Sequence, residues 1–457
     1  MFRFLLIPLL FLAACDPAGP QPERASRAAQ DLEPLPPMKV FAAQPAPRAT
    51  RPNSELQRDF LDLSFQMESG RALPTMSRFE GPISLRVTGA PPPSLAPDLR
   101  RLLDRLKAEA GISITQVPPT TQANITIEAL PQSRLQGLVP QAACFVVPRV
   151  TSWAEFRSRR RSRTTDWSTL ETRERVTIFV PSDVSPQELR DCLHEEIAQA
   201  LGPLNDLYRL PDSVFNDDNF HAVLTGFDML MLRTYYAPEL RSGMSRDEAA
   251  TVVPALLNRL NPAGRGGGSG GVSPTPRAWI TAIETALGPR TGNGRRLASA
   301  REAVDIARAR GWRDNRLAFA LFTYGRIVAG ANPEATLAAF QEARALYLAR
   351  PETRLHAAHV ATHLANFSLS AGQAEITLRL VDQNIGVVAK AENAALLSTL
   401  LMIRAEALLL QGRVTEARTA RLDSLGWARY GFGSQSEVRA RLNEIASIVP
   451  RAPASGG

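Results

Sequence analysis

The sequence predicts an α+β fold in which a mixed β-sheet domain is followed by an all-α helical repeat domain. Five short segments between residues 83 and 180 are rich in β-branched residues, which is typical of strands. Residues 262–277 are rich in Gly, Ser and Pro and are expected to form a flexible linker, because such a run has few side chains that pack. Beyond the linker, residues 278–450 are rich in Ala, Leu and Arg and show helical periodicity.

The first fifteen residues have the pattern of a bacterial lipoprotein signal. A short apolar run follows Arg3 and ends in Leu-Ala-Ala-Cys15, which resembles a lipobox. We expect cleavage before Cys15 and acylation of this residue by chains such as palmitate. The protein would then be anchored in the bacterial membrane on its periplasmic face. The alternative is a free cysteine in an ordinary cleaved signal peptide.

Two features after Cys15 indicate which membrane holds the protein and how its folded body is connected to that membrane. Asp16 resembles the signal that retains lipoproteins in the inner membrane of enteric bacteria. Residues 16–53 are rich in Pro and Ala and contain few aliphatic residues, so we expect an extended tether between the membrane and the folded body.

Residues 54–261 are expected to form the first domain. A helix over residues 54–68, with Ser54 as its N-cap, is predicted to pack onto this domain. The elements that follow are a strand from Ile83, a helix over 95–110, strands from Ile112, Ile125, Cys144 and Arg175, and a helix over 185–201 capped by Asp183 or Ser185.

The last of these helices carries the most informative segment, His-Glu-Glu-Ile-Ala-Gln-Ala-Leu-Gly-Pro-Leu-Asn-Asp, residues 194–206. In a zinc peptidase helix, two histidines four residues apart reach one metal ion from the same face, and a glutamate polarises the bound water. Here Ala198 stands four residues after His194, so a strict match fails. A frame shifted by one residue aligns the three ligand positions with Glu195, Gln199 and Asn205, the glutamate with Glu196 and the turn glycine with Gly202.

Further landmarks resemble the metzincin clan of metallopeptidases. Ser213, Val214 and Phe215 stand where those enzymes have their Met-turn, and residues 224–236 resemble the helix that begins Leu-Thr-x-x-Asp. More narrowly, the segments EEIAQALG, ND, PDSVF and YAPELRSGM resemble a family of proteobacterial lipoproteins that has no established activity. The resemblance spans roughly residues 80–250 and implies a metzincin-like fold without a defined reaction.

The replaced ligands argue against a zinc hydrolase. Zinc favours imidazole and thiolate, whereas Glu195, Gln199, Asn205 and the adjacent Asp206 offer oxygen atoms that suit Ca²⁺, Mg²⁺ or Mn²⁺. We therefore expect no zinc, no cofactor and a non-catalytic domain. The alternative is a metal-assisted hydrolase in which these residues hold a metal ion and Glu196 serves as the general base. His194 points about a quarter turn away from Glu195 and is expected to be a satisfied or an exposed histidine rather than a metal ligand.

Two cysteines remain after the signal segment. Cys144 and Cys192 form an even pair in a protein that is expected to be exported, which makes them candidates for a disulfide. A reactive Cys192 thiol beside the site is the alternative, although no histidine stands at a helical spacing that would activate it.

The net charge of +8 comes from 53 Lys plus Arg against 45 Asp plus Glu, and it suits an anionic partner such as phospholipid without requiring nucleic acid. A basic cluster is expected to lie in a solvated loop, where it either contacts an anionic surface or forms a plain insertion; it comprises Arg157, Arg159, Arg160, Arg161 and Arg163.

The second domain contains a repeat. Segments around Gly330, Gly372 and Gly412 align with spacings of 42 and 40 residues, and each glycine is predicted to lie between two helices. The run from Leu408 resembles a tetratricopeptide turn, in which the glycine is expected to allow close helix packing. Such arrays bind protein segments, so we expect an unknown envelope protein as partner; a helical cap for the first domain is the alternative. Residues 451–457 are expected to be a tail.

Overall fold

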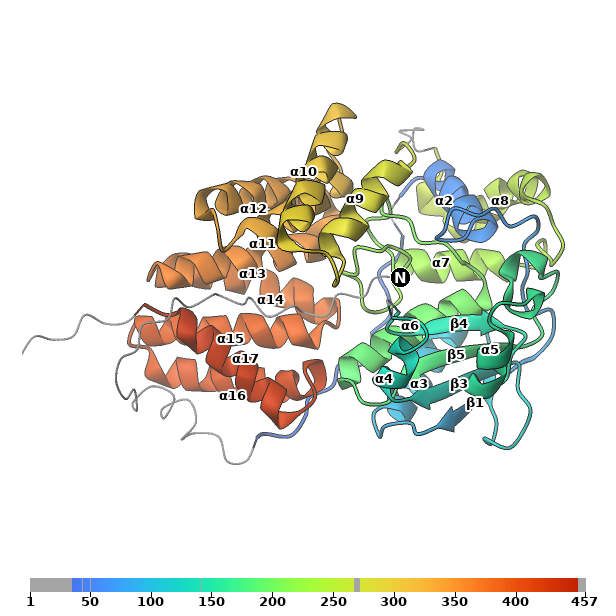
Figure 1. The fold of residues 1–457 in the computed structure, drawn as a ribbon, viewed down its shortest axis with the longest axis horizontal. Helices are drawn as coiled ribbons and strands as arrows, with labels where there is room; N and C mark the ends of the chain where they lie inside the picture. The colour runs from blue at the N-terminus through green and yellow to red at the C-terminus, as the bar shows by residue number, and fades with distance from the viewer. Residues whose placement is uncertain (1–34, 43, 50, 141, 267–271, 451–457) are drawn as a thin grey trace, which may run out of the picture. The chain divides into compact units, whose positions relative to one another are not determined.

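The computed structural model describes residues 35–42, 44–49, 51–140, 142–266 and 272–450. These residues form two units (Figure 1), the first comprising most of residues 42–275 and the second comprising residues 276–450 together with residues 35–41. The first contains a five-stranded mixed sheet, and the regular elements in the described part of the second are all helices, so the α+β fold class is confirmed. The expected signal segment with Cys15 and Asp16, and the tail over 451–457, lie outside the described residues.

The sheet of the first unit is mixed, with strand order β2-β1-β3-β5-β4. Strands β2, β1, β3 and β5 run parallel to one another, whereas β4 pairs antiparallel with β5. The strand bounds are β1 Ile83–Gly89, β2 Ile114–Gln116, β3 Ile125–Leu130, β4 Phe145–Pro148 and β5 Val176–Pro181.

Both faces of this sheet are covered, as the alternation along β5 illustrates. Val176, Ile178 and Val180 belong to the main core, while Phe179 points to the opposite face and joins a smaller core. In the smaller core, the rings of Phe145, Trp153, Phe156 and Phe179 lie 5.2 to 6.4 Å apart.

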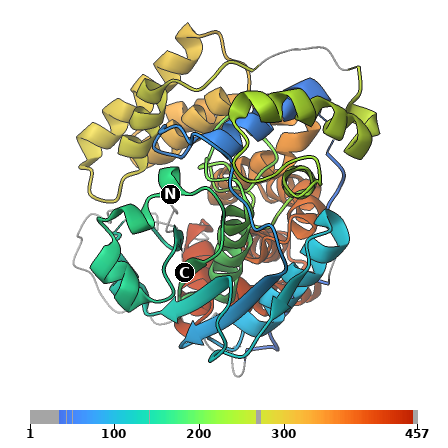
Figure 2. The ribbon, with the colours of Figure 1, turned by 90° about the vertical axis from the view of Figure 1, so that its right-hand side faces the viewer.

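Helices cover the two faces (Figure 2). Those of the first unit are α2 Asn53–Phe65, α3 Leu95–Arg105, α4 Gln132–Gln136, α5 Trp153–Arg159, α6 Pro186–Leu201, α7 Gly226–Tyr235 and α8 Arg246–Leu260. A π-helical turn over Leu106–Ala110 continues α3. The main core contains residues of α2, α3, α6, α7 and α8, whereas Trp153 and Phe156 of α5 belong to the smaller core.

Several local predictions were wrong. The N-cap of α2 is Pro52 rather than Ser54, and its side chain makes no capping hydrogen bond. Strand β2 begins at Ile114 rather than Ile112, because the left-handed Gly111 ends the preceding helix and the Ile112 amide donates to the Leu106 carbonyl oxygen at 3.1 Å. The arginine-rich stretch is not entirely a loop, since α5 extends to Arg159. Within the expected linker, residues 262–264 form a short 3₁₀ helix.

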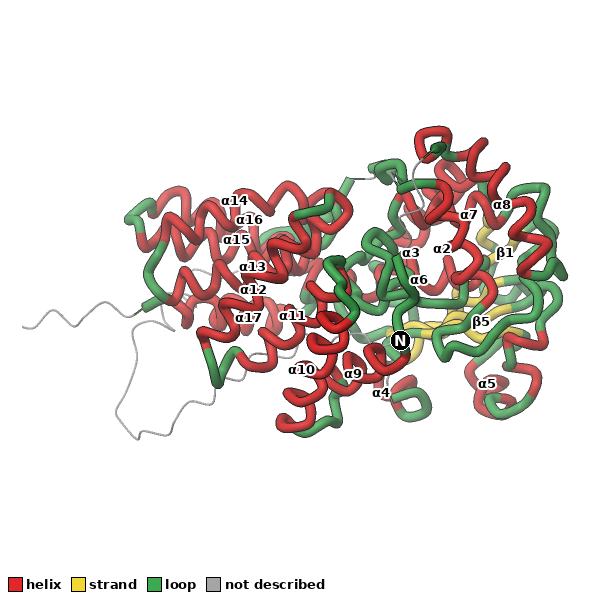
Figure 3. The backbone as a smooth tube through the Cα atoms, turned by 90° about the horizontal axis from the view of Figure 1, so that it is seen from above, coloured by secondary structure: helices red, strands yellow, loops and turns green. Residues whose placement is uncertain are grey.

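The second unit contains nine helices in its described part, and consecutive helices pack against each other (Figure 3). Their bounds are α9 Arg277–Leu287, α10 Asn293–Ala309, α11 Asn315–Val328, α12 Pro333–Leu348, α13 Arg354–Ser370, α14 Ala374–Lys390, α15 Ala394–Leu410, α16 Val414–Gly431 and α17 Gln435–Ile448. In neither unit does a helix of the described ranges combine the length and apolar character needed to cross a membrane.

The three repeat glycines lie between paired helices, as the sequence predicts. Gly330 lies between α11 and α12, Gly372 between α13 and α14, and Gly412 between α15 and α16. Close helix packing, the predicted reason for a glycine at position 412, is not observed, because a Cβ atom there would meet no other atom within 4 Å. Its φ of +74° gives the reason instead, since this left-handed conformation ends α15 at little steric cost only with glycine.

Candidate functional site

Helix α6 carries most of the candidate residues and runs through the main core of the first unit. Every residue from Cys192 to Asp206 is buried. Apolar side chains such as Leu193 and Ile197 belong to the core, while Glu195, Glu196 and Gln199 supply polar groups from the same helix. Glu196, the candidate general base, exposes 0% of its surface. A substrate would therefore have to displace covering residues before it reached this carboxylate.

The C-terminal end of α6 is held by Arg173, a residue that the sequence analysis did not identify. Its guanidinium donates hydrogen bonds to the carbonyl oxygens of Gln199 at 2.5 Å and Ala200 at 2.7 Å, and also to that of Gly202. It further contacts Ser77 Oγ at 3.3 Å and lies over the Trp167 ring. These carbonyls are among the groups that a helix end leaves without intrahelical partners, so Arg173 fixes where α6 stops.

The turn after α6 is fastened to α2. The Asn205 side-chain nitrogen donates a hydrogen bond to the Asp62 carbonyl oxygen at 2.9 Å, and the Leu204 amide donates to the Leu63 carbonyl at 3.1 Å. Asn205, a candidate metal ligand, is thus oriented by the backbone of a neighbouring helix. At Gly202, a Cβ atom would lie 2.9 Å from the Tyr235 ring, so close packing explains this glycine.

Asp206 lies in an acidic environment that the sequence indicated only in part. Burial, together with the negative charges of Glu68, Asp217 and Glu195, raises the pKa of Asp206 well above its ordinary value. Of these neighbours only Glu195 was a candidate. Charges act over longer distances than coordination bonds, so this pKa shift does not by itself indicate a metal site. In the described ranges, no group of three His, Cys, Asp or Glu side chains is arranged to share one metal ion.

His194 connects α6 to the segment before α7. Its Nδ1 accepts a hydrogen bond from the Leu224 amide at 3.1 Å, which requires this nitrogen to be unprotonated. Burial, reinforced by the positive charges of Arg190 and Arg105, holds the pKa of His194 well below its ordinary value. The neutral imidazole is therefore an acceptor with a structural role.

The segment that resembles a Met-turn is tied to the start of α7. The Asp228 carboxylate accepts hydrogen bonds from Ser213 Oγ at 2.5 Å, from the Val214 amide at 3.2 Å and from the Thr225 amide at 2.8 Å. Thr225 Oγ1 in turn accepts a hydrogen bond from the Asp228 amide, which completes a capping box. Burial raises the pKa of Asp228 to about 6, although these hydrogen bonds oppose the shift. Two landmarks of the predicted resemblance are thus joined by one buried aspartate.

A network of ion pairs around α2 was also not predicted from the sequence. Arg209 contacts Asp59 at 2.7 Å and Asp62 at 2.9 Å, so the loop after α6 is bound to α2 a second time. Arg51 contacts Asp59 at 2.5 Å and Asp212 at 2.9 Å. Except for Arg51 with Asp59, these pairs join residues that are distant in sequence, for which no local pattern exists.

A disulfide joins Cys144, at the start of β4, to Cys192 of α6. The two cysteines are separated by 48 positions, and their Cα atoms lie 5.9 Å apart. The bond attaches the candidate helix covalently to the sheet, and it leaves no free thiol at Cys192.

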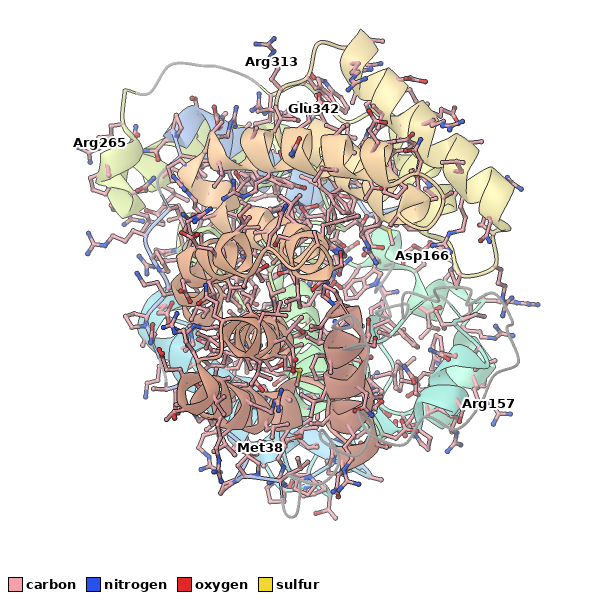
Figure 4. The ribbon with its side chains drawn as sticks, turned by 90° about the vertical axis from the view of Figure 1, so that its left-hand side faces the viewer. Met38, Arg157, Asp166, Arg265, Arg313 and Glu342 are labelled. Atoms are coloured by element: carbon pink, nitrogen blue, oxygen red, sulfur yellow. A yellow bond between two sulfur atoms is a disulfide. The ribbon has the colours of Figure 1, made fainter. Side chains whose placement is uncertain are left out.

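The predicted basic cluster lies at the end of α5 and in the following turns. The following five side chains are all exposed, and Figure 4 shows one of them, Arg157, at the margin of the view: Arg157, Arg159, Arg160, Arg161 and Arg163. Trp153 and Phe156 anchor the opposite side of the same helix in that core. The aromatic side chains therefore hold this helix against the sheet, and the arginine side chains are exposed to solvent.

Comparison with known protein families gives a match within the first unit. The profile of a family described as "Protein of unknown function (DUF2927)" matches residues 53–255. The matched range begins with α2 and ends within α8, so it covers the sheet and the whole candidate site. No curated protein matches the chain.

Proposed function

We propose that this protein is a lipid-anchored envelope protein with a metzincin-like, non-catalytic first domain and a tetratricopeptide-like helical domain that binds another protein. In this proposal, Cys15 carries the lipid on the periplasmic face, and Asp16 favours the inner membrane. Neither zinc nor another cofactor is required. The protein acts by binding or scaffolding rather than by cleaving a substrate.

The observation that carries the non-catalytic proposal is the use of the candidate positions as framework. Asn205 is bonded to the Asp62 carbonyl, and His194 accepts the Leu224 amide. Glu196 exposes 0% of its surface. A general base must come within hydrogen-bond distance of the proton that it abstracts, so a fully covered glutamate is poorly placed for hydrolysis.

The surface of the helical unit supports a binding role. A groove of about 470 Å³ is lined by residues of α14 and of the turn between α15 and α16, namely Glu375, Leu378, Arg379, Asp382, Gln383, Gln411 and Arg413. Large apolar side chains are exposed on the same helices, including Ile376, Leu409 and Val414. Apolar surface beside charged groups is typical of sites that bind protein segments.

Two measurements on the full chain test the proposal. The first compares cleavage of a peptide library by the wild type and by Glu196→Gln, using mass spectrometry. We expect no turnover above background from either protein. Cleavage that depends on Glu196 would refute the non-catalytic assignment.

The second measurement places a photo-crosslinking residue at Val414, beside the groove, and at the exposed Arg310 of the α10–α11 turn as control. We expect a discrete envelope protein to be captured from Val414 in living cells and not from Arg310. Equal capture at both positions, or at neither, would refute the proposed binding surface.

The alternative function is a metal-assisted hydrolase with oxygen ligands, and the acidic surroundings of Asp206 favour it. In that case Glu195, Gln199 and either Asn205 or Asp206 would hold Ca²⁺, Mg²⁺ or Mn²⁺, and Glu196 would activate water. Elemental analysis after equilibration with each ion separates the proposals. One retained ion per chain, lost in the Glu195→Ala, Gln199→Ala double variant, would establish the alternative.

A further inference from the structure

Residues 35–42 lie along α16 and contact it through alternate side chains. This segment has no helix or strand structure. Met38 and Val40 are exposed by 39% and 48%. Phe41 and Lys39 contact the helix, although the Lys39 side chain remains 47% exposed. Figure 4 labels Met38 at the edge of the helical unit. Alternation of this kind is how an extended peptide presents one side to a binding surface.

The contacts combine an aromatic stack with polar anchors. The rings of Phe41 and Trp427 stack with their centroids 4.3 Å apart. The Lys39 ammonium forms an ion pair with Asp423 and lies 5.6 Å from the centre of the Trp427 ring. Aromatic stacking and the cation–π contact each contribute stabilisation in addition to that from burial of apolar surface.

Two hydrogen bonds fix the backbone of the segment. The Lys39 amide donates to the Gly426 carbonyl oxygen at 3.0 Å, and Arg429 Nη1 donates to the Pro36 carbonyl oxygen at 2.8 Å. These bonds set the direction and register of the peptide on the helix, because each joins a defined backbone position to a defined helical residue.

Gly426 explains how the peptide approaches the helix so closely. A Cβ atom at this position would lie 3.0 Å from Lys39 Cγ and 3.4 Å from the Pro37 carbonyl oxygen. Glycine within a helix is unfavourable by about 1 kcal/mol relative to alanine. Its presence in the middle of α16 is accounted for by the peptide that lies against it.

We propose that Asp423, Gly426, Trp427 and Arg429 form a docking site for an extended, proline-rich peptide with a lysine and an aromatic residue two positions apart. The chain fills this site with its own residues 36–41. The prolines restrict the unbound segment and so reduce the entropy lost on docking. Docking within one chain is further favoured by the high effective concentration of the tethered segment.

Docking of residues 36–41 requires neither catalysis nor the lipid, but it changes the role of the expected tether. Its last part fastens to the helical unit instead of acting as a free spacer. If Cys15 is the membrane anchor, 20 residues separate it from Pro36. These correspond to about 70 Å of fully extended chain, which limits the reach of the helical unit from the membrane.

A lysine-specific endoprotease tests the docking in the full chain purified in detergent. The chain has three lysines, Lys39, Lys107 and Lys390, so cleavage after Lys39 gives a distinct fragment. We expect Phe41→Ala to raise the rate of this cleavage about tenfold or more, because the bond is protected while the segment is docked. Met38→Ala is the matched control, since its side chain is exposed, and should cleave like the wild type.

Free peptides spanning residues 35–42 with the same substitutions correct for the intrinsic preference of the protease. If the wild type and Phe41→Ala are cleaved at equal corrected rates, the segment is not docked and the proposal is wrong.

Peptide binding in trans tests recognition itself. A fluorescent peptide of residues 35–42 is titrated against the full-length Phe41→Ala variant, whose site is vacated. We expect binding to this variant, weaker binding to the wild type, and a loss of at least about tenfold when the peptide lysine is replaced by glutamate. Both the protein and its helix remain unchanged in this last comparison, so misfolding cannot account for the loss.

The proposal is wrong if the peptide does not bind to Phe41→Ala at millimolar concentration. It is also wrong if binding is unchanged both when the peptide lysine is replaced and when the protein carries Trp427→Ala.

Discussion

Arg173 offers the sharpest test of how the candidate helix is held in place. We expect Arg173→Met, which keeps much of the aliphatic volume, to remove the donors to the carbonyls of Gln199, Ala200 and Gly202. Hydrogen bonds from a charged donor contribute about 1.5–3 kcal/mol each, and a buried group left without a partner costs about 1–3 kcal/mol. Because such terms are not additive, we expect a loss of roughly 3–5 kcal/mol in the free energy of unfolding.

The assay is urea denaturation followed by tryptophan fluorescence, with amide hydrogen exchange to locate the effect. Trp167 lies against Arg173 and reports on this region. Exchange should rise most in the last turn of α6, residues 198–201. Arg175→Met is the matched control, because this side chain is exposed two positions away, and it should change stability by less than about 0.5 kcal/mol. A loss below about 1 kcal/mol for Arg173→Met would refute the reasoning.

Three further predictions concern other parts of the molecule. Replacing Cys144 and Cys192 together by serine should lower the free energy of unfolding by about 4 kcal/mol, as chain entropy predicts for a loop of 48 positions, measured by urea denaturation. In the folded protein the pKa of Asp228 is about 6, which is above its value in the unfolded chain. The contribution of Asp228 to the free energy of unfolding is therefore present at low pH and is lost as the pH rises through 6. Wild-type stability should therefore fall by roughly 2 kcal/mol, relative to Asp228→Asn, between pH 4 and 7. Serine at the five arginines of the basic cluster should abolish salt-sensitive binding of a Cys15→Ala chain to anionic liposomes.

Each of these predictions has its own control. The double cysteine variant should match the reduced wild type, and a stability equal to that of the oxidised protein would contradict the role of the disulfide. Parallel pH profiles for the wild type and Asp228→Asn would contradict the assignment of the titration to Asp228. For liposomes, the control replaces five exposed arginines of the helical unit, Arg295, Arg301, Arg308, Arg310 and Arg313, with the same loss of charge. Equal loss in both variants would indicate a nonspecific effect of net charge.

Local periodicity was enough to predict most of the elements. Strands β1, β3 and β5 and helix α6 lie where alternating or helical patterns place them, because both patterns arise within one segment. The Gly/Ser-rich stretch likewise marks the boundary between the units. Strand β2 is shorter than predicted because the Ile112 amide bonds to the Leu106 carbonyl oxygen at the end of the preceding helix, which alternation of residue types does not indicate.

The candidate site was predicted in part. The sequence places Glu195, Glu196 and Gln199 on one helix, and spacing alone achieves this. It gives no sign that the Asn205 side chain bonds to Asp62, 143 positions away, or that Arg173 ends the helix. Likewise, Glu68 and Asp217 reach Asp206 only through the folded chain. Contacts between distant segments decide whether such residues form a framework or a reactive site.

The thermal midpoint of the full chain, measured in chelator and then with saturating Zn²⁺, Ca²⁺, Mg²⁺ or Mn²⁺, tests the central claim most directly. If the candidate ligand positions serve as framework, the midpoint should change by less than about 1 °C with each ion. An ion that occupies a specific site at 100 times its Kd would stabilise the folded state by about 2.7 kcal/mol and raise the midpoint by several degrees. Such a rise, absent from a Glu195→Gln, Asp206→Asn variant, would contradict the account.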